Sequence, residues 1–244
     1  MHRNNLSVSL NVRPNHDQSS MWSEIKFRGH QLLMLLGHRP SVSSMLRSYI
    51  IPQYRRHIFS RKWYPSTKPL PDLAAITKKF PSIPSTAAYI IASSSQLTTV
   101  FEKDRVTSGI RSSRSFIVAT NHDNVAESNP NDLCKDFPVA DSQHVQRGME
   151  ALMDMIADST ERQTLMEKKW HKAKRAFKKT NPGTRTEEMY VTQNELSTWL
   201  QDYPITNEST HFACIMDPER GEVVWLRRWK GLVCDPSTSA DSVQ

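Results

Sequence analysis

The 244-residue sequence predicts an α+β protein in which antiparallel sheets pack against helices. Short apolar runs of strand length occur near the N-terminus, in the middle and near the C-terminus of the chain. Segments with the apolar spacing of amphipathic helices lie between these runs, and turn residues separate the central runs as in a meander. No Gly-rich phosphate-binding loop or dinucleotide fingerprint occurs, so nucleotide-dependent chemistry is not expected.

The N-terminal region predicts one strand followed by two helices. Residues 6–10 alternate apolar and polar side chains with the period of a half-buried strand. Residues 21–38 carry apolar side chains at helical spacing, and Gly37 stands where a helix C-cap is expected. Residues 41–54 predict a second helix, with Pro52 as a breaker near its end.

The central region predicts an exposed loop, a short helix and a three-stranded meander. Residues 55–72 are rich in basic residues and prolines, which favours a loop, and the helix covers residues 72–80. Three apolar runs separated by turn residues then predict strands at residues 87–92, 97–102 and 115–120.

The C-terminal half predicts an insertion, three helices and a hairpin. Residues 122–143 are polar and aperiodic, which indicates a long surface loop or insertion. Helices are predicted over residues 145–156, 160–179 and 192–199. Residues 211–227 hold two strand-like runs joined by a short Pro/Gly turn, the clearest hairpin pattern in the chain.

We therefore expect a single domain over residues 6–230, followed by a Ser-rich disordered tail at residues 231–244. The longest apolar run, residues 31–37, is far shorter than the roughly 20 residues of a transmembrane helix. The N-terminus has no apolar stretch typical of a secretory signal, and the sequence does not indicate a cellular compartment.

Net charge and cysteine content limit the classes of partner and of metal site that the chain can have. The chain has 32 Lys and Arg against 25 Asp and Glu, a formal net charge of +7 that favours anionic surfaces. The three cysteines, Cys134, Cys214 and Cys234, show no metal-ligand spacing, so neither a disulfide scaffold nor a zinc site is expected. No cofactor and no metal site is predicted.

Few segments could carry chemistry. Residues 120–123, Thr-Asn-His-Asp, follow a predicted strand and could present polar groups to a cleft, or could simply shape a turn. The basic run at residues 168–179 could hold phosphates, but such a run also fits the solvated face of a helix. Cys134 lies in the polar insertion with no base fixed against it, and we do not expect it to be a nucleophile.

Four segments share motifs and order with one known family. They are residues 8–13 (V-S-L-N-V-R), residues 87–105 (two strands ending in K-D-R), residues 116–123 (F-I-V-A-T-N-H-D) and residues 161–227 (E-R-Q-T to the last hairpin). The set resembles the acid ceramidase and N-acylethanolamine acid amidase family, whose corresponding motifs include V-S-L-N-E-R, V-V-x-T-N-Y-D and D-R-R-T. The resemblance extends over roughly residues 6–230.

This resemblance implies an N-terminal-nucleophile hydrolase with two antiparallel sheets sandwiched between helices, an αββα fold that is incomplete at its N-terminus in this chain. In the family, an N-terminal cysteine attacks the amide carbonyl of a fatty-acid amide while its own α-amino group handles the proton. The family's active-site asparagine and arginine match Asn121 and Arg162, for which a catalytic role is implied. Val12 stands where the family has a glutamate, and the nucleophile would lie on an upstream segment.

Three functional hypotheses follow. The first is a ceramidase-type hydrolase of a fatty-acid amide lipid, completed by an upstream segment that carries the nucleophile and able to contact a membrane surface. The family would place a full-length form in the lysosome or vacuole, or outside the cell. The alternative is a non-catalytic lipid-binding or partner protein on the same fold. A nucleic-acid-binding protein is the third, but it depends on net charge alone, so no nucleic-acid partner is expected.

Overall fold

A four-stranded antiparallel sheet organises the computed structural model, which describes residues 5–13, 20–51, 54–56, 63–65, 69–123, 143–185 and 189–229. The strand order is β1-β4-β5-β6. Its members are β1 (Ser7–Val12), β4 (Ala88–Ser93), β5 (Thr98–Lys103) and β6 (Ser108–Ser113). Each neighbouring pair is antiparallel, and the described chain combines such sheets with helices, which confirms the α+β class.

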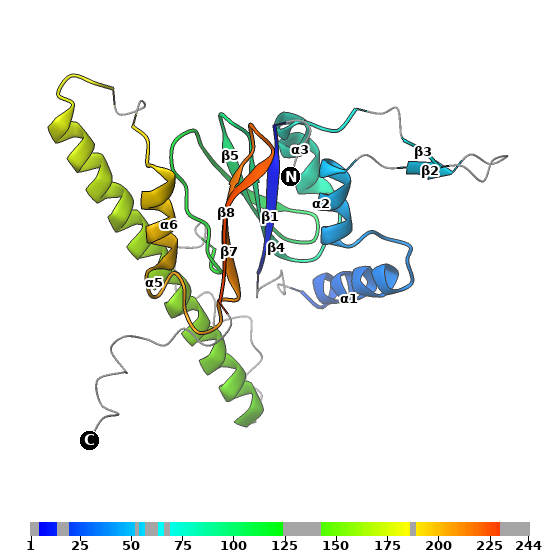
Figure 1. The fold of residues 1–244 in the computed structure, drawn as a ribbon. Helices are drawn as coiled ribbons and strands as arrows, with labels where there is room; N and C mark the ends of the chain where they lie inside the picture. The colour runs from blue at the N-terminus through cyan, green and yellow to red at the C-terminus, as the bar shows by residue number, and fades with distance from the viewer. Residues whose placement is uncertain are drawn as a thin grey trace.

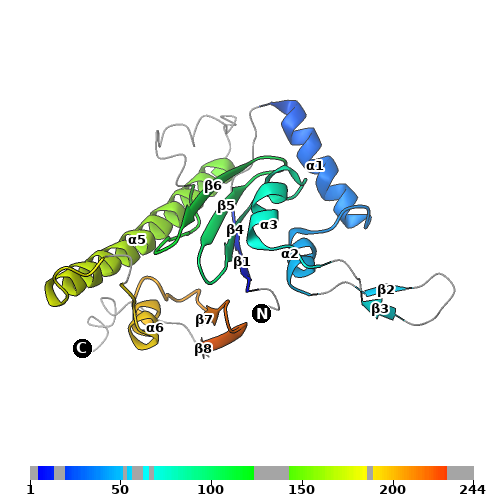
Figure 2. The ribbon, with the colours of Figure 1, turned by 90° about the horizontal axis from the view of Figure 1, so that it is seen from above.

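Helices and two further strand pairs surround this sheet. The helices are α1 (Met21–Leu35), α2 (Val42–Ile50), α3 (Leu73–Lys79), the 3₁₀ turn η1 (Phe80–Ser82), α5 (Gln143–Thr180) and α6 (Gln193–Gln201). The strand pairs are β2 (Tyr54–Arg56) with β3 (Trp63–Pro65) and β7 (Phe212–Asp217) with β8 (Glu222–Arg228). Figures 1 and 2 both place α5 on the opposite side of the sheet from α2 and α3.

Local chemistry explains where these helices begin and end. The side chains of Ser20, Ser41 and Asp72 each accept a backbone hydrogen bond at the start of α1, α2 and α3. Thr192 and Glu195 form a reciprocal capping box at the start of α6. Gly37 follows the end of α1 with a φ of +74°, a left-handed conformation that glycine adopts without steric cost.

The main hydrophobic core lies between the sheet and the helices α2 and α3. One row of paired residues crosses the sheet from Leu10 through Ile90 and Phe101 to Ile110. Its two central members are buried, whereas the two on edge strands remain partly exposed. The ring of Phe80 packs edge-on against Phe101 with centroids 5.3 Å apart. Because side chains alternate along a strand, Asn11, Tyr89 and Glu102 project from the other face, toward α5.

Three expectations about secondary structure need correction. The third strand of the meander is β6, and residues 115–120 form no strand. The backbone bond from Asp104 N to Thr107 O closes a short turn, so pairing with β5 resumes at Ser108. The predicted loop at residues 55–72 overlaps β2 and contains β3, whose three-residue lengths are too short to show an alternating pattern.

The third correction concerns α5, which is one helix where two were expected. Residues 157–159 are also helical and join the two predicted helices into one. At this junction the Thr160 hydroxyl donates to the Ile156 carbonyl at 2.8 Å. Most of the predicted insertion, residues 124–142, and the predicted tail, residues 231–244, lie outside the described residues. The strand at 6–10, the helices at 21–38, 41–54, 72–80 and 192–199, and the last hairpin are confirmed within a few residues.

Candidate functional site

Asn121 and Arg162 meet in the folded chain although 41 residues separate them. Asn121 lies in the irregular segment 114–123 that follows β6, and Arg162 lies near the middle of α5. The Arg162 Nη2 atom donates to the Asn121 Oδ1 atom at 3.3 Å. The structure therefore brings together the two residues for which the family resemblance implied one site.

Two further contacts orient the Asn121 side chain and backbone. Its Nδ2 atom donates to Oδ1 of Asn11 on β1 at 2.8 Å, and its backbone N–H donates to the Ser159 hydroxyl at 2.6 Å. Arg162 can only donate, so its bond also identifies the Asn121 atom facing it as the amide oxygen. The amide is thus held from β1 on one side and from α5 on the other.

A largely buried ion pair lies two residues beyond Asn121. Arg13 binds both carboxylate oxygens of Asp123, with Nε to Oδ1 at 2.7 Å, and the Tyr89 hydroxyl donates to the same Oδ1 at 2.8 Å. Burial acts to lower the pKa of Arg13, but the hydrogen bond and charge of Asp123 outweigh it and raise that pKa. Burial, then the charge of Asp123 and the hydrogen bond to it, raise the pKa of Tyr89. Both groups therefore keep their protons at neutral pH.

The 120–123 cluster is more than a turn. Asn121 and Asp123 bond to residues on β1, β4 and α5, all remote in sequence. The His122 Nδ1 atom lies 2.9 Å from the Ser159 hydroxyl, and the Thr120 hydroxyl lies 3.1 Å from the same His122 atom. The cluster therefore bonds to neighbouring elements of the fold, and two of its members, Thr120 and Asn121, also line a cavity.

Side-chain contacts, rather than strand pairing, hold segment 116–123 on the sheet. The Phe116 ring stacks on Trp170 of α5 with centroids 4.7 Å apart and planes 5° from parallel. Arg111 of β6 donates from Nη2 to the Val118 carbonyl at 3.3 Å and forms an ion pair with the buried Glu102 at 3.0 Å. The apolar residues that predicted a strand thus lie between the sheet and α5.

A cavity of about 380 Å³ adjoins the polar cluster. Its volume is in the range of small-molecule pockets, which are mostly apolar with a few convergent polar groups. Four polar residues, Asn11, Thr120, Asn121 and Arg162, are among those lining it. The remaining lining is apolar and consists of Ile91, Val100, Phe116, Ile117, Val118, Ala119, Met166, Leu200 and Ile205.

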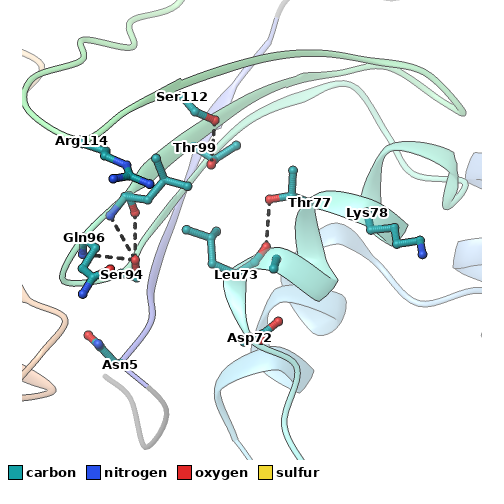
Figure 3. Close-up of a pocket in the computed structure, with 12 residues that line it drawn as sticks. Asn5, Asp72, Leu73, Thr77, Lys78, Ser94, Gln96, Thr99, Ser112 and Arg114 are labelled. Carbon is teal, nitrogen blue, oxygen red and sulfur yellow. Dashed lines mark hydrogen bonds between the residues drawn. The ribbon is translucent and has the colours of Figure 1, made fainter.

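A second, larger hollow of about 660 Å³ lies on the other side of the sheet, between α3, the β4–β5 turn and β6 (Figure 3). Thr77 and Thr99 line it but bond within the fold, to the Leu73 carbonyl and to the Ser112 hydroxyl respectively. Arg114 and Lys78 also line it, but both are exposed. None of the sequence-predicted site residues reaches this hollow.

The other sequence candidates stay apart from the site. In the basic run of α5, Lys169 pairs with Asp202, and most of the remaining cations are exposed, as on a solvated helix face. Cys214 lies on β7, whereas Cys134 and Cys234 fall outside the described residues. In the described ranges, no three His, Cys, Asp or Glu side chains gather as metal ligands would.

Sequence reasoning missed Asn11, Ser159 and Tyr89 as members of the site. Asn11 carried a signal, because it belongs to the V-S-L-N-V-R motif and alternates onto the polar face of β1. Ser159 and Tyr89 carried none, since their partners are distant in sequence. No protein-family model matches the chain, and neither a curated protein nor a solved structure matches it.

Proposed function

We propose that this chain forms part of a ceramidase-type amide hydrolase whose site contains Asn121 and Arg162. The observation that carries the proposal is the contact between these two side chains at the wall of an apolar cavity. A fatty-acid amide needs the same combination, an apolar space for its acyl chain beside fixed polar groups for its carbonyl.

In this proposal, Arg162 and Asn121 stabilise the negative oxygen that forms when a nucleophile attacks the amide carbonyl. The Arg162 guanidinium keeps its charge at any working pH and carries five N–H donors in a fixed plane. Asn121 is held by Asn11 and Ser159, so little reorganisation is required when charge develops. Each such donor typically contributes about 10²–10³ in rate.

The acyl chain would occupy the apolar part of the cavity. Ile91 and Val100 come from the sheet, Met166 from α5, and Leu200 from the end of α6. These side chains offer apolar surface to a hydrocarbon chain but no specific hydrogen bonds, which fits a substrate class defined by chain length.

The finer fold assignment is also a proposal. We assign β7 and β8 to the second sheet of an αββα sandwich, with α6 on its outer side and with α2 and α3 on the outer side of the main sheet. Two arrangements support this: helices lie on both sides of the main sheet, and α6 lies beside β7 (Figures 1 and 2).

Neither Asn121 nor Arg162 can act as the nucleophile, because an amide and a guanidinium lack a nucleophilic atom at neutral pH. The family resemblance places that role on a cysteine N-terminal to the strand that matches β1. We therefore propose that a cysteine-bearing segment completes the site. Its thiolate would attack the amide carbon, and its α-amino group would pass the thiol proton to the departing amine, leaving a thioester for water to hydrolyse.

The alternative function is lipid binding without catalysis. Val12 occupies the position of the family's glutamate, so one site carboxylate is replaced by an apolar side chain. The same cavity could then retain a fatty-acid amide without cleaving it, and the two functions predict the same binding but different turnover.

Hydrolysis of a fluorogenic fatty-acid amide, N-palmitoyl aminomethylcoumarin, tests the proposal at acidic and at neutral pH. We expect no turnover by this chain alone and measurable turnover once the cysteine-bearing segment of a ceramidase is fused before β1. In the fusion, Asn121→Ala and Arg162→Ala should each lower kcat at least tenfold, while Arg114→Ala in the second hollow should not.

Two results would reject this assignment. Turnover by the unfused chain that survives Arg162→Ala would place the chemistry elsewhere, with Cys214 as the first residue to substitute. A fusion that binds the palmitoyl amide with the same affinity as the chain alone but never cleaves it would favour the lipid-binding alternative.

A further inference from the structure

Helix α1 has apolar side chains on two opposite sides. Phe27 and His30 point inward and are buried, as in an ordinary surface helix. A surface helix normally carries polar side chains on its outer side, and a helix that is apolar all round is normally buried. On α1 and its C-cap, six large apolar residues are 51–86 % exposed: Met21, Trp22, Ile25, Leu32, Leu35 and Leu36.

These exposed residues form one continuous surface. At 3.6 residues per turn, Ile25 and Leu32 lie on the same side of the helix, opposite Phe27 and His30. Met21 and Leu36 extend this surface to both ends of the helix. We call the six exposed residues the α1 apolar face.

The contacts of the inner side fix which way this face points. The Arg39 Nη1 atom donates to the His30 Nδ1 atom at 2.8 Å, and His30 is 1 % exposed. The Ser20 cap and Gly37 define the two helix ends. Both ribbon views place α1 at the periphery of the molecule, beyond α2 (Figures 1 and 2). The α1 apolar face is therefore held outward by the packing of the opposite side.

Cationic residues border the face. Lys26 is exposed beside Trp22. Arg28, whose side chain is 66 % exposed, lies between Met21 and Leu35 around the helix and forms an ion pair with Glu24 of the preceding turn at 2.6 Å. The chain as a whole carries a net charge of +7. Lysine and arginine can lay their aliphatic stems along an apolar surface while the charges reach polar headgroups, and tryptophan favours the same boundary.

We propose that the α1 apolar face docks onto a lipid surface that contains anionic headgroups, with the helix lying parallel to that surface. None of the described helices is both long and apolar enough to cross a bilayer. A peripheral helix that buries one apolar face at the headgroup boundary matches the side chains and charges of α1. The first sequence hypothesis already allowed contact with a membrane surface; this inference assigns such contact to the α1 apolar face and does not depend on the proposed hydrolysis.

Vesicle flotation of the full chain tests the docking surface. We expect the protein to float with vesicles of phosphatidylcholine and phosphatidylglycerol, to bind pure phosphatidylcholine more weakly, and to dissociate as salt is raised. Replacing Leu32→Gln and Leu35→Gln together should lower the partition coefficient at least tenfold. Both side chains are exposed, so the variant should keep its circular-dichroism spectrum and unfolding midpoint.

The matched control replaces two exposed apolar residues elsewhere, Val223→Gln and Leu226→Gln on β8. We expect this variant to float like the wild type. Equal loss of flotation in both variants, or no difference between anionic and neutral vesicles, would overturn the proposal.

Light scattering after size exclusion distinguishes a second copy of the chain from a membrane. A dimer that depends on Leu32 and Leu35, without vesicle binding, would assign the face to self-association and overturn the lipid assignment. Arg162→Ala should leave flotation unchanged, so failure of the catalytic proposal and failure of this one give separate results.

Discussion

Arg13 and Asp123 form a bidentate ion pair across 110 residues of sequence. Asn11 and Asn121, also 110 residues apart, are joined two positions earlier on each segment. Because both contacts join residues that are 110 positions apart, residues 121–123 run alongside residues 11–13 at the end of β1. Asn121 is thereby anchored from the side of the sheet, independently of Arg162 on α5.

Asp123→Asn should destabilise the protein by roughly 3 kcal/mol, because it leaves the largely buried Arg13 guanidinium without its counter-charge. Urea denaturation followed by far-ultraviolet circular dichroism measures this loss. As a control, Arg220→Gln removes the partner of Asp217 in an exposed ion pair on the β7–β8 turn and should change stability by less than about 0.5 kcal/mol. Equal effects of the two variants would contradict an anchoring role for Asp123.

Lys103→Met should also destabilise the fold, by about 3 kcal/mol. The Lys103 side chain is fully buried, and its Nζ atom donates to four backbone carbonyls, those of Pro81, Asp104, Arg105 and Thr107. Methionine would fill the space but leave these acceptors without their donor. Lys78→Met on the exposed side of α3 serves as the control.

The same lysine predicts an alkaline pH dependence. Burial lowers the pKa of Lys103 to about 8, from 10.5 for an ordinary lysine. Between these values the unfolded chain binds a proton that the folded chain does not, so this group makes stability rise as pH rises from 8 to 10.5. Lys103→Met should flatten that rise, and an unchanged slope would show that Lys103 does not titrate in this range.

The buried His30 predicts that the stability of the fold also depends on pH in the acidic range. Burial and the nearby cations Arg39, Arg105 and Lys103 lower the pKa of His30 below the ordinary 6.5. Arg39 can only donate, so it binds an unprotonated Nδ1, and the buried Nε2 atom has no hydrogen-bond partner in the described part of the chain. As pH falls below 6.5, protonation favours the unfolded chain, and stability should fall.

Thermal unfolding at a series of pH values checks this sign. His30→Gln keeps a side chain that can accept from Arg39 but cannot titrate, so its stability should depend less on pH below 6.5. His38→Gln replaces an exposed imidazole just beyond α1 and is the matched control. A steeper acid loss in His30→Gln than in wild type would contradict the prediction.

Phe116→Leu should loosen the site without unfolding the domain. The substitution keeps an apolar side chain of similar volume but removes the parallel stack on Trp170, at a cost of about 1 kcal/mol. Because the stack lies at one end of the segment that carries Asn121, affinity for the palmitoyl amide should fall more than stability does. Phe212→Leu, on the exposed start of β7, should change neither quantity.

Most helices and strands could be predicted from the sequence because the signals for their ends and faces lie within a few neighbouring residues. The cap at Asp72, the glycine after α1 and the alternating residues of β1 and β4 each depend on a few neighbouring residues. The strand predicted at residues 115–120 was wrong because the prediction also used only local pattern. An apolar run of this length fits a strand as well as it fits a packed irregular segment. Contacts made in the folded chain distinguish them, such as the stack on Trp170, which is more than 50 positions away.

The pairing of Asn121 with Arg162 came from motif resemblance and not from periodicity, which says nothing about residues 41 positions apart. The partners of that pair show the limit of motif matching. Asn11 was inside a matched motif but had no assigned role, and Ser159 lay outside every motif. Both became visible only when β1 and α5 were placed around segment 116–123.

The stack of Phe116 on Trp170 also fixes the number of residues that can separate each ring from the site residue on the same segment. On α5, Trp170 lies eight residues after Arg162, and on the facing segment Phe116 lies five residues before Asn121. An extra residue between 162 and 170 would turn Trp170 by about 100° around the helix and shift it by about 1.5 Å along the axis. The stack and the asparagine–arginine contact could then no longer form together. Among homologous sequences, both spacings should therefore be free of insertions and deletions.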